Sequence, residues 1–165
     1  MQLKRVVVTG LGALTPIGKD LNSYWDNLVK GVSGAGPITK FDPEKFKTKF
    51  ACEIKDYNPN DYFDRKEARK MDLFTQYAMI SAQEAMTNSG LDLEKIDTNK
   101  AGVIWGSGIG GLRTFQEEVA SFAQGDGTPR FNPFFIPKMI ADISAGMISI
   151  KYGFHGPNFV TVSAC

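Results

Sequence analysis

The sequence has few of the residues on which several classes of protein depend. Its 165 residues include two cysteines, Cys52 and Cys165, and one histidine, His155. Two cysteines cannot form the disulfide framework of a small secreted protein, so a reducing, cytoplasmic setting is expected. A lone histidine without a cluster of further ligands also argues against a metal site.

Neither sign of charge dominates, and long apolar runs are missing. The 19 Lys and Arg residues against 18 Asp and Glu give a formal net charge of +1, whereas general nucleic-acid binders carry a strong basic excess. No run of about 18 apolar residues is present, so no membrane span is expected. The start of the chain, residues 1–5, also lacks the pattern of a signal peptide. The apolar share of 42% is enough for a buried core and excludes a disordered chain.

Short apolar runs alternate with amphipathic segments along the chain. Buried parallel strands, which are apolar without alternation, are predicted for residues 5–9, 101–105 and 159–162. Helices are predicted for residues 21–28, 65–88, 112–122 and 137–152, and irregular structure with short elements for 31–62. This alternation indicates an α/β fold, in which helices cover a mostly parallel sheet.

A glycine-rich segment, Gly106–Gly111 (GSGIGG), follows one predicted strand and precedes a helix. It matches the G-x-G-x-x-G pattern of dinucleotide-binding proteins, which also need an acidic residue about 20 positions on. The residue at that distance is Asp126, which lies in a loop rich in Gly and Pro. We therefore favour close packing near a buried site over nucleotide binding as the reason for these glycines.

Cys165 follows the last predicted strand. A thiol at a turn from strand to helix can be held as a thiolate by the helix amides, and the same amides can stabilise an oxyanion. That helix would lie beyond residue 165, and a lone cysteine is more often a packing residue. His155, in the turn 152–157, is expected to be solvated and not to serve as a base for Cys165. Because the sequence stops directly after an apolar strand, we expect it to be a piece of a longer protein.

Two further segments could contact ligands. Arg65–Lys70 (RKEARK) places cations in the first turns of a predicted helix that begins with Asp64 and Glu67 as a capping box. Cations there oppose the helix dipole, which indicates an anionic partner such as an acidic protein surface; ordinary surface charge is the equal alternative. Phe131–Pro137 places three aromatic residues beside two prolines, which suits core packing, an apolar-ligand wall or a subunit interface.

Taken together, these segments resemble the β-ketoacyl-acyl carrier protein synthases. The matching segments, in family order and near family spacing, are 6–12 (VVVTGLG), 15–18 (TPIG), 65–72 (RKEARKMD), 106–111 (GSGIGG), 132–137 (NPFFIP), 152–157 (YGFHGP) and 163–165 (SAC). No single segment is specific, but the set is. Ile109, inside the glycine-rich segment, is similar to the residue at this position in the type II (elongating) enzyme of bacterial fatty-acid synthesis.

The resemblance implies a thiolase-like fold with α-β-α-β-α layers, in which residues 1–165 form the N-terminal half of a synthase domain that dimerises with a second copy. It implies no cofactor and no metal, because the substrates arrive on the phosphopantetheine of acyl carrier protein. The site residues that it implies are Cys165 as the acylated nucleophile, Gly108, Ile109 and Phe135 at the acyl pocket, with Phe135 reaching across the dimer interface, and Lys66, Arg69 and Lys70 as the carrier-protein contacts.

The implied reaction is a decarboxylative Claisen condensation. The acyl chain moves from carrier protein to Cys165, and malonyl-carrier protein then loses CO₂ and extends the chain by two carbons. The family's condensation step uses two histidines and a lysine; these lie outside this sequence, and His155 matches neither histidine. These 165 residues alone are therefore not expected to be active. A polyketide-type ketosynthase subunit and a non-catalytic carrier-binding subunit of the same fold are the alternatives, and Cys165 argues against the second.

Overall fold

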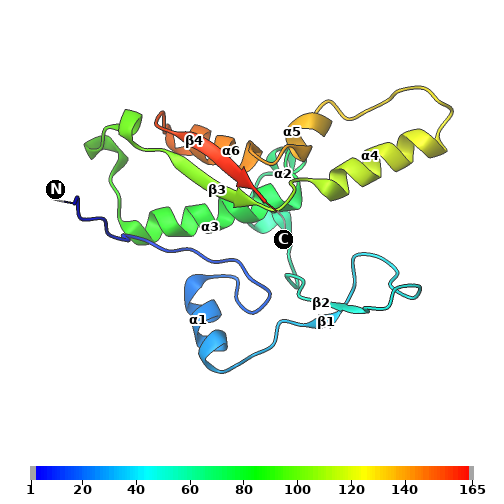
Figure 1. Cartoon of the computed structure of the whole chain (residues 1–165), viewed down its shortest axis with the longest axis horizontal. Coiled ribbons are helices and arrows are strands. Elements are labelled where there is room, and N and C mark those ends of the chain that lie inside the picture. Colours follow the sequence, from blue (N-terminus) through cyan, green and yellow to red (C-terminus); the bar gives the residue numbers. More distant parts are fainter. Residues whose placement is uncertain (1–2, 164–165) are drawn as a thin grey trace. The chain divides into compact units, whose positions relative to one another are not determined.

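The computed structural model describes residues 3–163, which form two compact units (Figure 1). The first unit contains the residues up to 58 together with 80–91, and the second contains 59–79 and the residues from 92 onward. The long helix α3 (Leu73–Ser89) supplies residues to both units. None of the described helices is long and apolar enough to cross a bilayer.

The first unit begins its regular structure with α1 (Leu21–Val29), at the predicted place. Asp20 caps this helix: its side chain accepts a hydrogen bond from the Ser23 amide at 2.8 Å, and the Ser23 hydroxyl accepts one from the Asp20 amide at 3.3 Å. This reciprocal capping box satisfies two amides that the first turn would leave free. The predicted irregular segment, 31–62, holds the short antiparallel pair β1 (Gly36–Pro37) and β2 (Phe50–Ala51) and a 3-10 turn at its end.

The strand predicted for residues 5–9 is wrong for the described chain. The segment is unpaired, and Val6 and Val8 are 90% and 79% exposed. A strand needs a neighbour to receive its backbone hydrogen bonds, and the described residues place no strand beside it. The apolar run 5–9 predicts a buried strand, but the described part of the chain does not bury it.

Side chains of α3 hold the backbone that follows this segment. The Leu11 amide donates to Asn88 Oδ1 at 3.1 Å, and the Ala13 amide donates to Glu84 Oε2 at 2.7 Å. Gly12 packs so closely on α3 that a Cβ atom would collide with the Ser81 carbonyl. Glycine is therefore required at this position.

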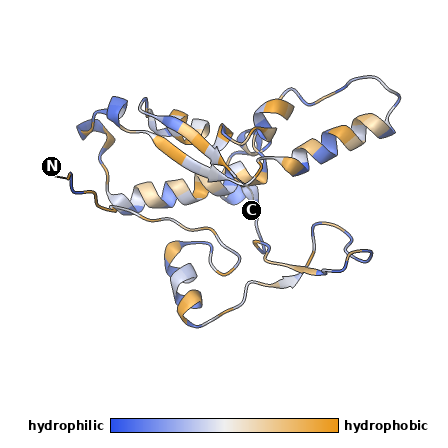
Figure 2. Cartoon of the chain, viewed as in Figure 1, coloured by the Kyte–Doolittle hydropathy of each residue, from blue (hydrophilic) through white to orange (hydrophobic). Residues whose placement is uncertain are grey.

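The second unit contains the parallel strands β3 (Val103–Ser107) and β4 (Asn158–Val162), as predicted. Between them the chain forms α4 (Leu112–Gln124), α5 (Phe135–Met139) and α6 (Ile143–Tyr152). Hydrophobic and hydrophilic residues alternate along α4 (Figure 2). Three short 3-10 turns complete the unit at Pro59–Asp61, Leu93–Lys95 and Thr98–Lys100.

The core of the second unit is formed by residues of α6, of β3 and of the first half of α3, together with Met71. Its buried apolar residues are Met71, Ala78, Met79, Val103, Ala145 and Ile148. Thr75 of α3 and Ser144 of α6 are fully buried, and their hydroxyls are 3.4 Å apart. Small side chains at this contact allow the two helices to approach closely.

The single helix predicted for residues 65–88 is wrong: the chain forms α2 (Arg65–Ala68), a turn, and then α3. The side chain of Asp72 caps the start of α3, because its carboxylate accepts a hydrogen bond from the Phe74 amide at 3.3 Å. The predicted capping box at the start is also wrong, since Asp64 makes no side-chain cap hydrogen bond. The helix predicted from Pro137 is likewise interrupted, because Ile140 is extended between α5 and α6.

Candidate functional site

The paired ends of β3 and β4 lie at the centre of the candidate site. Ser107 at the end of β3 pairs with Val162 at the end of β4. Because the strands are parallel, the residues that follow them leave the sheet at the same edge. Gly108 and Ile109 follow β3 at this edge, and Ser163 follows β4; Cys165 lies outside the described residues.

Gly108 and Ile109 face open space in the described part of the chain. The Ile109 side chain is 61% exposed, and a Cβ atom on Gly108 would have no described atom within 4 Å. A large apolar side chain is therefore presented beside the ends of two parallel strands, which is where open α/β sheets bind ligands.

The next glycines serve packing, as the sequence indicated. Gly110 has φ +90, and a Cβ atom there would collide with the carbonyl of Met139, at the end of α5. The Gly111 amide donates to that carbonyl at 2.9 Å. This contact occupies an amide at the start of α4 that a dinucleotide phosphate would need.

Asp126 is engaged in its own turn. Its carboxylate accepts a hydrogen bond from the Thr128 amide at 2.9 Å, which lowers the pKa of Asp126 below its usual value. Arg130 is its ion-pair partner at 3.4 Å. The geometry around the GSGIGG segment therefore supports packing rather than a nucleotide site.

Phe135 belongs to a cluster of rings on α4, α5 and the segment between them. Its ring centroid lies 6.2 Å from that of Phe115 and 5.7 Å from that of Phe131, and Phe131 lies 5.4 Å from Phe122. Phe135 is half-buried, while the other three rings are between 41% and 44% exposed. The cluster combines packing with an apolar surface, so core packing, an apolar-ligand wall and a subunit interface all stay open for this segment.

Lys66, Arg69 and Lys70 are exposed, as a docking surface requires. The dipole argument is wrong for Arg69 and Lys70, because α2 ends at Ala68 and these two residues follow its C-terminus, where cations are stabilised. The ammonium of Lys70 lies 5.6 Å from the centroid of the Phe134 ring. The cationic surface is thus present, but its position on the helix does not indicate a partner.

The remaining reactive side chains, His155 and Cys52, do not belong to a cluster of possible metal ligands within the described residues. His155 is exposed, as predicted, and its amide donates to the Thr98 carbonyl at 2.9 Å. Cys52 is an exposed free thiol. Within residues 3–163 no group of three or more His, Cys, Asp or Glu side chains could hold a metal ion.

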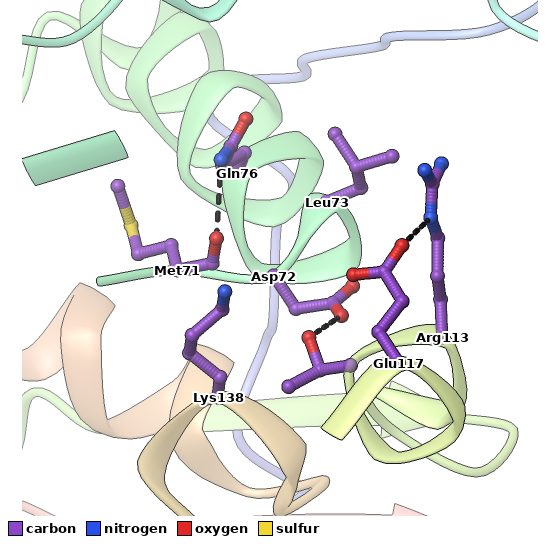
Figure 3. A pocket seen from close by; sticks show the side chains of 8 residues that line it. Met71, Asp72, Leu73, Gln76, Arg113, Glu117 and Lys138 are labelled. Atoms are coloured by element: carbon purple, nitrogen blue, oxygen red, sulfur yellow. Dashed lines mark hydrogen bonds and ion pairs between the residues drawn. The ribbon is translucent and has the colours of Figure 1, made fainter. Parts of the chain in front are cut away.

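A polar pocket at the start of α3 was not predicted from the sequence. It has a volume of about 230 Å³, and its lining residues are Met71, Asp72, Leu73, Gln76, Arg113, Thr114, Glu117 and Lys138 (Figure 3). Thr114 donates a hydrogen bond to Asp72, and Arg113 pairs with Glu117 at 2.7 Å, which raises the pKa of Arg113. An Asp before an apolar helix was the signal that could have revealed Asp72 as a cap.

Residues 3–165 match the model of the N-terminal domain of β-ketoacyl synthases. The chain belongs to the β-ketoacyl synthase family. It is 47% identical over 165 residues to the 3-oxoacyl-[acyl-carrier-protein] synthase 2 of Staphylococcus aureus strain COL, covering 99% of this chain and 39% of that protein. This member of the β-ketoacyl synthase family therefore spans about two fifths of the length of the curated relatives that it matches.

Two solved structures also resemble this β-ketoacyl synthase chain. The ishigamide ketosynthase/chain length factor superposes with a TM-score of 0.83 at 25% identity, covering 94% of this chain and 39% of that one. A type II polyketide acyl-carrier protein in complex with its ketosynthase, bound to the hexaketide, gives 0.76 at 25% identity, with coverage of 95% and 42%. The predicted thiolase-like α/β fold is confirmed.

Proposed function

We propose that this chain is the N-terminal half of an elongating 3-oxoacyl-acyl carrier protein synthase of fatty-acid biosynthesis. The observation that carries the proposal is the 47% identity over nearly the whole chain to a protein of that name. The condensation residues, two histidines and a lysine, would come from sequence beyond residue 165. The proposed protein works in the cytoplasm as a homodimer and needs no bound cofactor.

In the proposed first step, the thiolate of Cys165 attacks the thioester carbonyl of an acyl-carrier protein. The carbon–sulfur bond to phosphopantetheine breaks, its thiolate leaves, and the acyl group remains on Cys165 as a new thioester. Malonyl-carrier protein then loses CO₂, and its carbanion equivalent attacks that thioester and releases the cysteine thiolate. A thiolate suits both steps because it is a good nucleophile and a good leaving group.

The proposed acyl pocket is bordered by Gly108, Ile109 and Phe135, with Phe135 reaching across the dimer interface. The exposed Ile109 at the end of β3 supports this assignment, because β4 leads toward Cys165 at the same sheet edge. The apolar rings packed around Phe135 suit a fatty chain better than a polar substrate.

Acyl carrier protein is the proposed partner, with Lys66, Arg69 and Lys70 as its contacts. The exposure of these three cations supports the assignment. A solved complex of a ketosynthase with its acyl-carrier protein supports it further, since that ketosynthase superposes on this chain with a TM-score of 0.76.

A polyketide-type ketosynthase is the second candidate, because one of the two solved structures described above is a type II polyketide complex and the other is a ketosynthase/chain length factor. Their 25% identity is much lower than the 47% to the fatty-acid synthase relative, which favours the first candidate. A non-catalytic subunit of this fold would not need the thiol of Cys165.

Intact-mass analysis of the full-length protein from its source, after incubation with a palmitoyl-carrier protein, tests the proposal. We expect one palmitoyl group on the wild type and on Cys52→Ala, and none on Cys165→Ala. Adding malonyl-carrier protein should then yield a 3-oxoacyl product longer by two carbons. Labelling that survives in Cys165→Ala would contradict the mechanism, and repeated condensation without reduction would favour the polyketide candidate.

A further inference from the structure

We infer that Asp72 and Thr114 are positioning residues that connect the carrier-protein contacts to the loop carrying Ile109. The inference rests on the proposed function for the roles of those two ends, but the connection itself is read from hydrogen bonds. It assigns a purpose to the polar pocket between α3, α4 and α5, which the proposed mechanism does not use.

On one side, the end of the cationic segment is fixed to the start of α3. Gln76 is only 4% exposed, and its side-chain amide donates to the carbonyls of Ala68 and Met71 at 3.0 and 3.2 Å. The Gln76 backbone amide donates to the Asp72 carbonyl at 3.1 Å. The turn 69–72, which contains Arg69 and Lys70, is therefore held at both of its ends.

On the other side, Thr114 lies in the first turn of α4, just after the GSGIGG segment. It is only 5% exposed, and its hydroxyl donates to the second carboxylate oxygen of Asp72. The other carboxylate oxygen of Asp72 accepts from the Phe74 amide. One carboxylate thus ties the end of the cationic turn and the start of α3 to the start of α4.

The hydrogen bond from Thr114 to Asp72 lies at the wall of the polar pocket. A pocket of about 230 Å³ opens beside the two side chains, and Figure 3 shows Asp72 among the side chains that line it. Neighbouring Arg113 instead pairs with Glu117 of its own helix. A hydrogen bond to a charged acceptor is among the stronger single contacts available to such a junction.

A displacement of the cationic turn on carrier binding would therefore be transmitted to the start of α4 and to Ile109. Without the Thr114 hydroxyl, a carrier protein could still dock, but the acyl pocket would be less well positioned when it does. Small thioesters that bypass the docking surface would not depend on the connection.

The test compares two acyl donors with the full-length protein: palmitoyl-carrier protein and palmitoyl-coenzyme A. We expect Thr114→Val to slow Cys165 acylation from the carrier protein about tenfold, the equivalent of one hydrogen bond to a charged group, and to leave the coenzyme A reaction within about twofold. Thr114→Ser keeps the hydroxyl and should restore the carrier-dependent rate. Thr75→Val removes another buried hydroxyl of the same unit, and should affect neither donor selectively.

Equal slowing of both donors by Thr114→Val would overturn the inference, because a purely structural role predicts it. No rescue by Thr114→Ser would also overturn it, because the hydroxyl would then not be the group responsible. Amide hydrogen exchange gives an answer independent of activity: the amides of residues 108–112 should exchange faster in Thr114→Val and as in the wild type in Thr75→Val. Unchanged exchange would overturn the connection. A wild type that neither donor acylates would instead overturn the proposed function, and the exchange data would still decide the connection.

Discussion

The ammonium of Lys70 lies over the ring of Phe134, 5.6 Å from its centroid. Lys70 belongs to the turn between α2 and α3, whereas Phe134 directly precedes α5. A cation–π contact therefore joins a proposed carrier-protein contact to the segment that carries Phe135. The cation is held in one place by the ring, so it would lose less side-chain entropy on binding an anionic partner.

Replacing Phe134 with Leu should weaken binding of acyl carrier protein although Phe134 carries no charge. Exposed cation–π contacts contribute about 0.5–1 kcal/mol, so we expect the dissociation constant to rise about two- to fivefold. Titration of fluorescently labelled carrier protein would measure it. Phe122→Leu is the matched control, because Phe122 is similarly exposed, at 41% against 40%. Equal affinities of the two variants would remove the role given to Phe134.

Charge reversal of Lys66, Arg69 or Lys70 should weaken carrier binding more than loss of the ring does. Each variant replaces attraction of an acidic partner by repulsion, and exposed charges are screened over about 10 Å at 0.1 M salt. We therefore expect a large loss of affinity at low salt that shrinks as salt is added. Lys100→Glu is a control with the same charge change on an exposed side chain of the same unit. A loss that is independent of salt, or equal in the control, would argue against an electrostatic docking surface.

Local sequence patterns predicted the elements whose stability is local. The helix after Asp20 forms because its cap is made by the nearby Ser23. The pairing of β3 with β4 is not local, but both strands lie in the same unit and find each other as partners there. The run 5–9 has the same apolar pattern, but a strand also needs a partner, and none of the described residues provides one. Strand formation could not be predicted there from composition alone.

Site residues that lie within a single sequence motif could be predicted. Contacts between segments that are distant in sequence could not. Ile109 and Lys70 were found because each lies in a recognisable motif. The bond from Thr114 to Asp72 joins positions 42 residues apart in sequence, and Asp72 lies in the break between α2 and α3. Periodicity predicted a continuous helix across that break, so it hid both the cap and the pocket.

The capping box of α1 should make stability depend on acid pH. Hydrogen bonds from the Ser23 amide and hydroxyl lower the pKa of Asp20, so its contribution is fully present above the unfolded value of about 4 and is lost as pH falls through the lower folded value. Asp20→Ala should cost about 1 kcal/mol at pH 7 and progressively less in acid. Asp20→Asn should keep most of the cap at pH 7 and titrate no longer. Thermal unfolding at several pH values measures this, and an Asp20→Ala deficit that stays constant down to pH 2 would contradict it.

Gly110→Ala should disturb the loop beside the acyl pocket, whereas the same change at Gly146 should not. Gly110 has φ +90 and faces the Met139 carbonyl, so a methyl group adds backbone strain of about 1–3 kcal/mol and must also displace the end of α5. Gly146 lies inside α6 with no atom within 4 Å of an added Cβ, so alanine there should stabilise the helix by up to about 1 kcal/mol. We expect Gly110→Ala to lower the melting temperature. Since Ile109 precedes Gly110, we also expect the variant to slow Cys165 acylation by long-chain donors more than acylation by acetyl donors. If both chain lengths slowed equally, the loop would support the fold without shaping the pocket.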